Sequence, residues 1–298
     1  MSQRDNGTKY CGCKRVCSIK KNGTENNSSC KAENLNSMIE SSLRIDPSNT
    51  KCFFMVLARD AKNVAEKIAE LQGLGVPFVV VCGEEFKHPN VVYRAAKGKW
   101  DAINFGAKFI PQDTEVILFN DVDTRIHNFA FALHCLSSKA DLVYCRVKVS
   151  EGPQVLFYRI LNPIRQRFHV CASGEFMLVK RKVFETVMPI PPCIAEDSYI
   201  LFRALELGFR AYFCTETYVT TQRTSNRQEE EAYKSRTTLG IYQALSYSKP
   251  TLFIRVFYYL LPTFSPLLMI AGGDGVAWAK GIRKAVKANI TKKQVTKF

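Results

Sequence analysis

The feature that most constrains the fold is an apolar run that ends in two carboxylates. Residues 116–120 (VILFN) read as a buried strand, and Asp121 and Asp123 follow it with one residue between them. Ligands of open α/β sheets bind outside the carboxyl ends of the strands, so both acids are expected at a ligand site. Two carboxylates there suit a hard divalent cation, which commonly lies beside phosphates. A simple Asx turn at a polar strand end is the alternative interpretation.

Size and charge narrow the possible partners. The chain has 298 residues, 46% of them apolar, which indicates a globular protein with a substantial core. The 42 Lys and Arg residues exceed the 27 Asp and Glu residues by 15, so a phosphorylated substrate, an anionic lipid or a nucleic acid is an expected partner. Residues 275–298 contain seven basic side chains and no acid, so the charge is concentrated at this end.

The first 50 residues differ from the rest. Residues 1–50 are polar without apolar periodicity, which predicts a disordered leader. Cys11, Cys13, Cys17 and Cys30 lie in it, and their spacing matches neither a zinc ribbon nor a zinc finger, so metal binding by this cluster is left open. The other seven cysteines fall in apolar segments, as is typical of a reduced, intracellular protein.

Strands and helices alternate from residue 52 onward. The expected strands are 52–58, 78–82, 91–93, 116–120, 141–147, 176–179 and 209–214, and the expected helices are 61–74, 98–110 and 197–207. Such alternation predicts right-handed crossovers and a mainly parallel, doubly wound α/β sheet covered on both faces. This catalytic domain is expected to span residues 51–240.

Two of the expected helices begin with charged side chains. Lys99 follows Gly98 at a helix start, where free N–H groups and the helix dipole favour an anion such as a diphosphate. Glu196 and Asp197 begin the helix near residue 197, where one acid would raise the pKa of the other and favour a general base. A solvated basic helix start and an acidic helix cap are the respective alternatives.

Taken in order, these motifs resemble the family-2 glycosyltransferases of the GT-A fold. The resemblance covers residues 52–240 and is carried by GKWDAINFG (98–106), FNDVDT (119–124), SGEF (173–176) and EDSYILF (196–202). It implies an inverting, hexosyltransferase-type enzyme that uses Mg²⁺ or Mn²⁺. Such an enzyme moves a sugar from a nucleotide-sugar donor to an acceptor hydroxyl.

The resemblance also implies roles for individual residues. Asp197 would be the catalytic base, Asp123 would hold the metal, and Asp121 would contact both the metal and the nucleotide. The other donor-binding residues would be Ala58, Asp60, Glu84, Lys99 and Asn104. The acceptor site would be lined by Ser173, Gly174, Glu175, Glu196 and Arg236.

The sequence also departs from the family pattern. Ala58-Arg59-Asp60 and Cys82-Gly83-Glu84 replace the usual strand ends, so the donor's base and sugar are left open. Only Arg236 remains of the Gln-x-x-Arg-Trp signature of polymerising members, which favours transfer of a single sugar.

Residues 241–298 are expected to form a membrane-associating helical tail. Residues 256–273 are apolar but only about as long as the ~20 residues that a span needs, and Pro262 and Pro266 interrupt them. A single crossing would place the basic end opposite a cytoplasmic catalytic domain, against the usual distribution of Lys and Arg. A peripheral or re-entrant helical hairpin avoids that conflict. The acceptor itself is unknown, and a lipid or lipid-linked glycan would suit this location.

An amphipathic helix is expected after the apolar segment. Trp278, Ile282, Ala285 and Val286 share one face of it, and basic side chains occupy the opposite face. This pattern predicts contact with an anionic membrane surface, and packing on the domain with a solvated basic face is the alternative.

Three other functions are weighed against glycosyl transfer. A sugar nucleotidyltransferase would need a glycine-rich phosphate loop after the first strand, and residues 56–67 have none. Nucleic-acid binding is not expected, because Trp278 and Phe298 are the only aromatic residues of the basic segment 275–298. A non-catalytic sugar- or nucleotide-binding relative is the third possibility, against which the intact acids argue.

Overall fold

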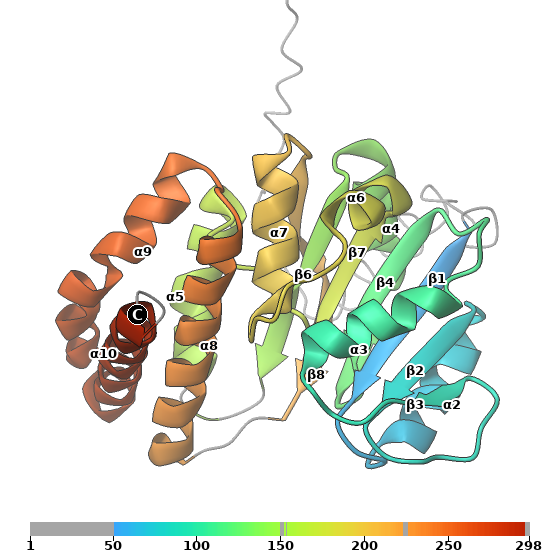
Figure 1. Ribbon diagram of the computed structural model, residues 1–298, viewed down its shortest axis with the longest axis horizontal. Coiled ribbons are helices and arrows are strands. Elements are labelled where there is room, and N and C mark those ends of the chain that lie inside the picture. The colour runs from blue at the N-terminus through green and yellow to red at the C-terminus, as the bar shows by residue number, and fades with distance from the viewer. Residues whose placement is uncertain (1–50, 150–151, 153, 223–225, 296–298) are drawn as a thin grey trace, which may run out of the picture. The chain divides into compact units, whose positions relative to one another are not determined.

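The computed structural model describes residues 51–295, apart from 150–151, 153 and 223–225 (Figure 1). The expected leader and its cysteine cluster lie outside the described residues. One sheet of eight strands has the order β3-β2-β1-β4-β7-β6-β8-β5. Its strands are β1 (Cys52–Ala58), β2 (Phe78–Cys82), β3 (Val91–Tyr93), β4 (Val116–Asp121), β5 (Thr124–His127), β6 (Leu142–Val149), β7 (Phe176–Lys180) and β8 (Ala211–Thr221).

The central strands are buried on both faces. β1 pairs in parallel with β2 and with β4, and β2 pairs in parallel with β3, so their carboxyl ends meet at one edge of the sheet. β7 runs antiparallel to both β4 and β6. β8 is parallel to β6 and antiparallel to β5, which makes four of the seven pairings parallel.

Helices cover both faces of the sheet. Alternate residues of each strand point to opposite sides, and because both sets are apolar, both faces must be buried. Phe54 and Val56 of β1 belong to one core cluster with α2 (Val64–Leu74) and α4 (Phe129–Ser138). Met55 and Leu57 belong to a second cluster with α3 (Lys99–Gly106), α6 (Arg181–Val187) and α7 (Glu196–Glu206). The predicted α/β class, with a mainly parallel and doubly wound sheet, is confirmed.

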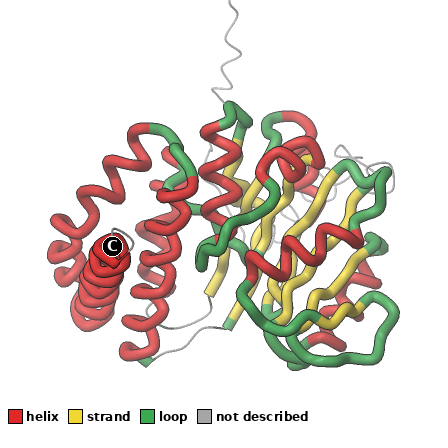
Figure 2. Tube along the Cα trace, viewed as in Figure 1, coloured by secondary structure: helices red, strands yellow, loops and turns green. Residues whose placement is uncertain are grey.

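The remaining helices lie together beside the sheet, as Figure 2 shows. They are α5 (Gln154–Phe168), α8 (Arg227–Tyr247), α9 (Leu252–Phe264), the 3-10 helix η2 (Ser265–Ala271) and α10 (Gly272–Val295). The expected domain boundary at residue 240 falls inside α8. The sequence did not indicate α5, which contains Pro163, or the short strand β5.

The apolar face of α10 packs against α8 and does not face outward. Trp278, Ile282 and Ala285 are 0%, 3% and 0% exposed, and the Trp278 Nε1–H donates a hydrogen bond to Glu230 Oε1 at 3.0 Å. A Cβ atom on Gly281 would lie 2.7 Å from the carbonyl oxygen of Glu231, so only glycine permits this approach of the two helices. The expectation that this face contacts lipid is therefore corrected: α8 covers it, as in the alternative interpretation.

The exposed apolar surface lies instead on α9 and η2. Residues 252–290 contain a helical stretch that, among the described residues, is long and apolar enough to cross a membrane, and 17% of its apolar window is buried. The helix is interrupted where η2 begins and again at Gly272, whose φ of 71° is in the left-handed region. The predicted C-terminal apolar and amphipathic helices are thus present.

We expect replacement of Trp278 by Ala to lower the free energy of unfolding by about 3–5 kcal/mol, since it removes a buried ring and one hydrogen bond of the buried Glu230. Urea unfolding followed by circular dichroism measures this loss. Ile290→Ala is the control, because Ile290 lies on the same helix and is 52% exposed. Equal stability of the two variants would mean that α10 does not pack on α8 in solution.

Candidate active site

A cavity of about 840 Å³ lies at the carboxyl ends of β1, β2 and β4. The sheet edge and the start of α3 form one wall, and α5, α8, α9 and α10 form the other. Several predicted site residues line this cavity: Ala58, Lys99, Asp121, Ser173, Gly174, Glu175, Glu196, Asp197 and Arg236. The structure therefore brings together residues that lie far apart in the sequence.

Asp121 and Lys99 form an ion pair at the centre of the cavity. Asp121 is the last residue of β4, and Lys99 Nζ lies 2.6 Å from each of its carboxylate oxygens. Lys99 is the first residue of α3, and Gly98 before it has a φ of 124°, which a side chain would strain. Burial disfavours the charged form of Lys99, but the carboxylates of Asp121 and Glu196 outweigh that effect and raise its pKa.

Glu196 and Asp197 begin α7 on the other side of Lys99. The Asp197 carboxylate accepts a hydrogen bond from the Ser198 backbone N–H at 2.7 Å. A Cβ atom on Gly174 would lie 3.4 Å from the Asp197 Cβ and 3.5 Å from its Oδ2. Gly174 therefore packs directly against the side chain of Asp197. The Ser173 hydroxyl is engaged elsewhere, since it donates to the Cys145 carbonyl at 2.8 Å.

The pKa values of the cavity acids are raised. Burial raises the pKa of Glu196 to about 8, with a contribution from Asp197 that the charge of Lys99 opposes. Burial, followed by the neighbouring Glu175, raises the pKa of Asp197. Burial also raises the pKa of Asp121, although Lys99 counteracts it. The site therefore combines the ammonium of Lys99 with three carboxyl groups that hold protons more tightly than in water.

The loop before α7 is fixed by α8 and α3. A Cβ atom on Gly240 of α8 would lie 2.7 Å from the Ala195 backbone nitrogen. Asn104 of α3 both donates to the Ile190 carbonyl at 2.8 Å and accepts from the Ile190 N–H at 2.9 Å. Asn104 is not part of the cavity lining. Its two hydrogen bonds hold the loop that leads to Glu196.

Three more predicted site residues lie outside the cavity lining. Asp60 accepts a hydrogen bond from the Lys62 N–H at 3.1 Å, and Glu84 accepts one from the Ala61 N–H at 3.0 Å. These two acids shape the loop after β1. Asp123 is exposed in the turn between β4 and β5. No group of three potential metal ligands occurs among the residues that the structure describes.

Lys67 of α2 is an important residue that the sequence analysis missed. It is 2% exposed, and its ammonium donates to Glu70 Oε2 at 2.6 Å, to Asn120 Oδ1 at 2.7 Å and to the Thr124 carbonyl. Glu70 in turn accepts from the Ile126 N–H at 2.7 Å. Lys67 therefore ties α2 to both sides of the Asp121–Asp123 turn. The signal was its position three residues after Val64, on the apolar face of the helix.

No family model matches this sequence, and no curated protein matches it. Three similar solved structures illustrate the likeness of fold. The inositol-1-phosphate CTP transferase from T. maritima has a TM-score of 0.39 at 13% identity, over 58% of this chain and 89% of that one. HddC from Yersinia pseudotuberculosis, complexed with GMP-PN, has a TM-score of 0.36 at 11% identity, over 58% and 93%.

The third is a Drosophila beta-1,4-galactosyltransferase in complex with manganese, UDP-Gal and xylobiose. It has a TM-score of 0.33 at 17% identity, over 54% of this chain and 64% of that one. All three likenesses are weak, so the chemistry of this chain is inferred from its own residues.

We expect replacement of Glu196 by Gln to stabilise the protein increasingly as the pH rises. Because the pKa of Glu196 is raised from 4.5 to about 8 by folding, the native wild type holds a proton that the unfolded chain releases. Its stability therefore falls between these two pH values, and the variant lacks this loss. Urea unfolding in metal-free buffer should show the advantage of the variant growing by about 2 kcal/mol from pH 6 to pH 8. A pH-independent difference would contradict the raised pKa.

We expect replacement of Lys67 by Met to lower the free energy of unfolding by about 3 kcal/mol, because it leaves buried acceptors without a donor. The turn that carries Asp121 and Asp123 should also loosen, which hydrogen exchange at residues 121–126 would detect. Lys62→Met is the control, since Lys62 is exposed on the loop before the same helix. Similar effects of both variants would show that Lys67 does not hold the turn.

Proposed function

We propose that this chain is an inverting glycosyltransferase that moves one sugar from a nucleotide-sugar donor to an acceptor hydroxyl. One observation carries the proposal: Lys99 and Asp121 lie in the same cavity as Glu196 and Asp197, opposite them and linked to them by charge. A cation for a diphosphate and a carboxylate for a proton are the two groups that displacement at an anomeric carbon needs.

The donor would lie along the sheet edge and the start of α3. Arg59, Lys97 and Lys99 line this wall, and the N-terminus of α3 adds the positive end of its dipole. Gly83 allows the ends of β1 and β2 to approach closely, since a Cβ atom there would lie 2.2 Å from the Arg59 carbonyl oxygen. These features suit a nucleoside diphosphate, and they do not identify its base.

The residues present fit a divalent cation. Asp121 already holds a cation, the ammonium of Lys99, with both carboxylate oxygens, and Asp123 follows two residues later. Mg²⁺ and Mn²⁺ commonly use one or two carboxylates together with substrate phosphates. Asp121 and Asp123 would hold the ion, which would neutralise the leaving diphosphate. Lys99 would then be released from Asp121 and would contact the diphosphate directly.

Asp197 is the proposed catalytic base. It would take the proton from the acceptor hydroxyl as the oxygen attacks the anomeric carbon from the side opposite the diphosphate. Its raised pKa brings it closer to that of an effective base at neutral pH. Glu196, with a pKa of about 8, would be mostly neutral there and would repel neither the donor diphosphate nor Asp197. Ser173, Gly174, Glu175 and Arg236 would line the acceptor side.

We also propose that the protein works at a membrane surface, with its catalytic domain in the cytoplasm. The supporting observation is the exposed apolar surface of α9 and η2, where Leu252, Tyr259, Leu267 and Ile270 are 72%, 81%, 62% and 87% exposed. Patches of this kind commonly mark a protein or membrane contact. The exposed Arg283, Lys284 and Lys287 of α10 would favour an anionic membrane.

We expect replacement of Asp197 by Asn to reduce transfer at least about 10²-fold, because the amide cannot accept the proton. Donor binding should persist, because Lys99 and Asp121 are untouched. Transfer would be measured with a panel of UDP- and GDP-sugars and Mn²⁺, and donor binding by calorimetry. Glu185→Gln is the control, because it removes the charge of an exposed carboxylate of α6 that lies outside the cavity lining.

Two outcomes would contradict these assignments. Loss of donor binding in the Asp197 variant would remove this residue from the role of base. Release of pyrophosphate from a nucleoside triphosphate and a sugar phosphate would identify a nucleotidyltransferase, since glycosyl transfer releases a nucleoside diphosphate.

A further inference from the structure

The wall of the cavity opposite the donor side combines positive charge with an apolar lining. This helical wall is formed by α5, α8, α9 and α10, and it lies next to Asp197. Among its described lining residues Arg165, Lys234 and Arg236 are cations, and none is an acid. Such a wall fits an anion on a largely apolar molecule.

Arg165 is the most unusual of these cations. Its side chain is 1% exposed, its Nε donates to the Cys171 carbonyl at 3.2 Å, and its Nη2 is buried without a hydrogen-bond partner among the described residues. The guanidinium lies 4.9 Å from the centre of the Phe213 ring and 5.3 Å from that of Tyr144. A buried N–H group without an acceptor is unfavourable, and an anion brought by a ligand would supply an acceptor for Nη2.

Lys234 and Arg236 extend this charge along α8. Lys234 is 5% exposed and lies 3.9 Å from Glu230, which balances part of its charge from behind the wall. Arg236 is exposed and stacks on Tyr233 at 5.7 Å, so it is accessible to an entering molecule. These cations thus range from the exposed Arg236 to the buried Lys234 and Arg165.

The rest of the helical wall is apolar and continues to the surface. Leu161 and Ile164 of α5 and Phe257 and Leu261 of α9 line the cavity. Ile160 also lines it and is 46% exposed. Outside, α5 and α9 are joined by the stacked rings of Phe168 and Phe253, whose centres are 4.1 Å apart. An apolar chain leaving the cavity past Ile160 would therefore meet the exposed face of α9.

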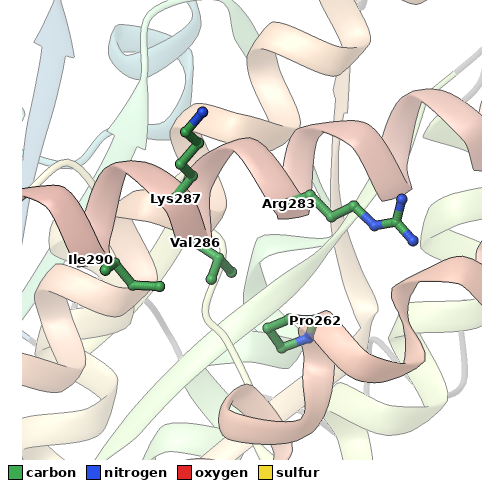
Figure 3. Close-up of a pocket in the computed structure, with 5 residues that line it drawn as sticks. All are labelled: Pro262, Arg283, Val286, Lys287 and Ile290. Atoms are coloured by element: carbon green, nitrogen blue, oxygen red, sulfur yellow. The ribbon is translucent and has the colours of Figure 1, made fainter.

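A second hollow, between α9 and α10, also combines an apolar lining with basic side chains at its edge. It has a volume of about 270 Å³, and Val286 and Ile290 point toward Pro262 in it, whereas Lys287 points away (Figure 3). Basic side chains of α10 thus border the apolar surface at its edge. This arrangement favours a membrane whose lipids carry negative headgroups.

We propose that the acceptor is a phosphate-bearing lipid whose phosphate lies against Arg165 and Arg236 and whose hydrocarbon chain leaves past Ile160. The proposal rests on the glycosyl transfer proposed above. A neutral lipid would offer no anionic acceptor to Arg165 Nη2 or to the exposed Arg236. A soluble phosphorylated sugar would leave the apolar wall uncovered. The acceptor oxygen bonds to the anomeric carbon and its proton passes to Asp197. The bond to the diphosphate breaks, and its electron pair leaves with the nucleoside diphosphate.

Trp278 provides a direct test, because it is buried in the helical wall and lines the cavity. The full chain contains two tryptophans, so Trp100→Phe leaves Trp278 as the only reporter. Dihexanoyl phosphatidylglycerol, dihexanoylglycerol and glycerol 3-phosphate would be titrated separately, without donor and below the micelle concentration. We expect the phosphate lipid to change the fluorescence of Trp278 at concentrations at least tenfold lower than the other two probes. Binding of dihexanoylglycerol or of glycerol 3-phosphate as tight as that of the phosphate lipid would overturn the proposal.

Charge variants locate the phosphate. In the same single-tryptophan protein, Arg236→Gln should weaken binding of the phosphate lipid about tenfold and leave dihexanoylglycerol unaffected. Arg255→Gln is the matched control, an exposed arginine of α9 outside the cavity lining. Equal weakening by both variants would indicate surface attraction and overturn the assigned site. Arg165→Gln should weaken binding further, and Arg236→Gln keeps the test valid if that variant does not fold.

The proposed function and the acceptor class fail in different ways. Arginine-dependent lipid binding without transfer from any nucleotide sugar would refute the glycosyltransferase and still support the lipid-phosphate site. Donor-dependent transfer to dihexanoylglycerol but not to phosphatidylglycerol would support the glycosyltransferase and refute the anionic acceptor.

Discussion

The structure of the site depends on the ammonium group of Lys99, which pairs with Asp121 and is also attracted by the charge of Glu196. Asp121, Glu175, Glu196 and Asp197 all line one cavity, and each ionised pair in such a place repels by several kcal/mol at short range. Lys99 offsets this repulsion from the start of α3, and protonation of Glu196 offsets more of it. A cavity with fewer cations would have to hold these acids neutral, and it would then lack both a base and a cation ligand.

Holding opposing charges at fixed positions requires a scaffold that does not yield. Gly83 and Gly240 allow backbone segments to approach closer than any side chain would permit, which fixes the end of β1 and the start of α7. Lys67 fixes the Asp121–Asp123 turn because its ammonium donates hydrogen bonds to Asn120 and Thr124 on either side of the turn and to Glu70 on its own helix. None of these three residues has a proposed catalytic role, but their contacts fix the positions of Asp121 and Asp197 relative to each other.

The sequence predicted the strands well, because continuous apolar runs flanked by glycine and acids have few other interpretations. The resemblance to family-2 glycosyltransferases implied one site for Lys99, Asp121 and Asp197, and all three line the same cavity. The position of Lys67 on the apolar face of its helix indicated burial, but its partners Asn120 and Thr124 could not be predicted because they are distant in sequence. Asn104 and Glu84 failed to appear in the cavity for a similar reason: their hydrogen bonds are made to backbone atoms that are distant in sequence.

The C-terminal helices illustrate the limit of amphipathic patterns. Trp278 and Ile282 form an apolar face that suits lipid and protein equally well, since periodicity reports that a face is buried but not what buries it. Here α8 buries it, and α10 thereby becomes part of the cavity wall. The segment predicted to be a membrane tail thus lines the same cavity as Asp197. In the proposed function, the edge of the sheet would bind the donor and these helices would bind the acceptor.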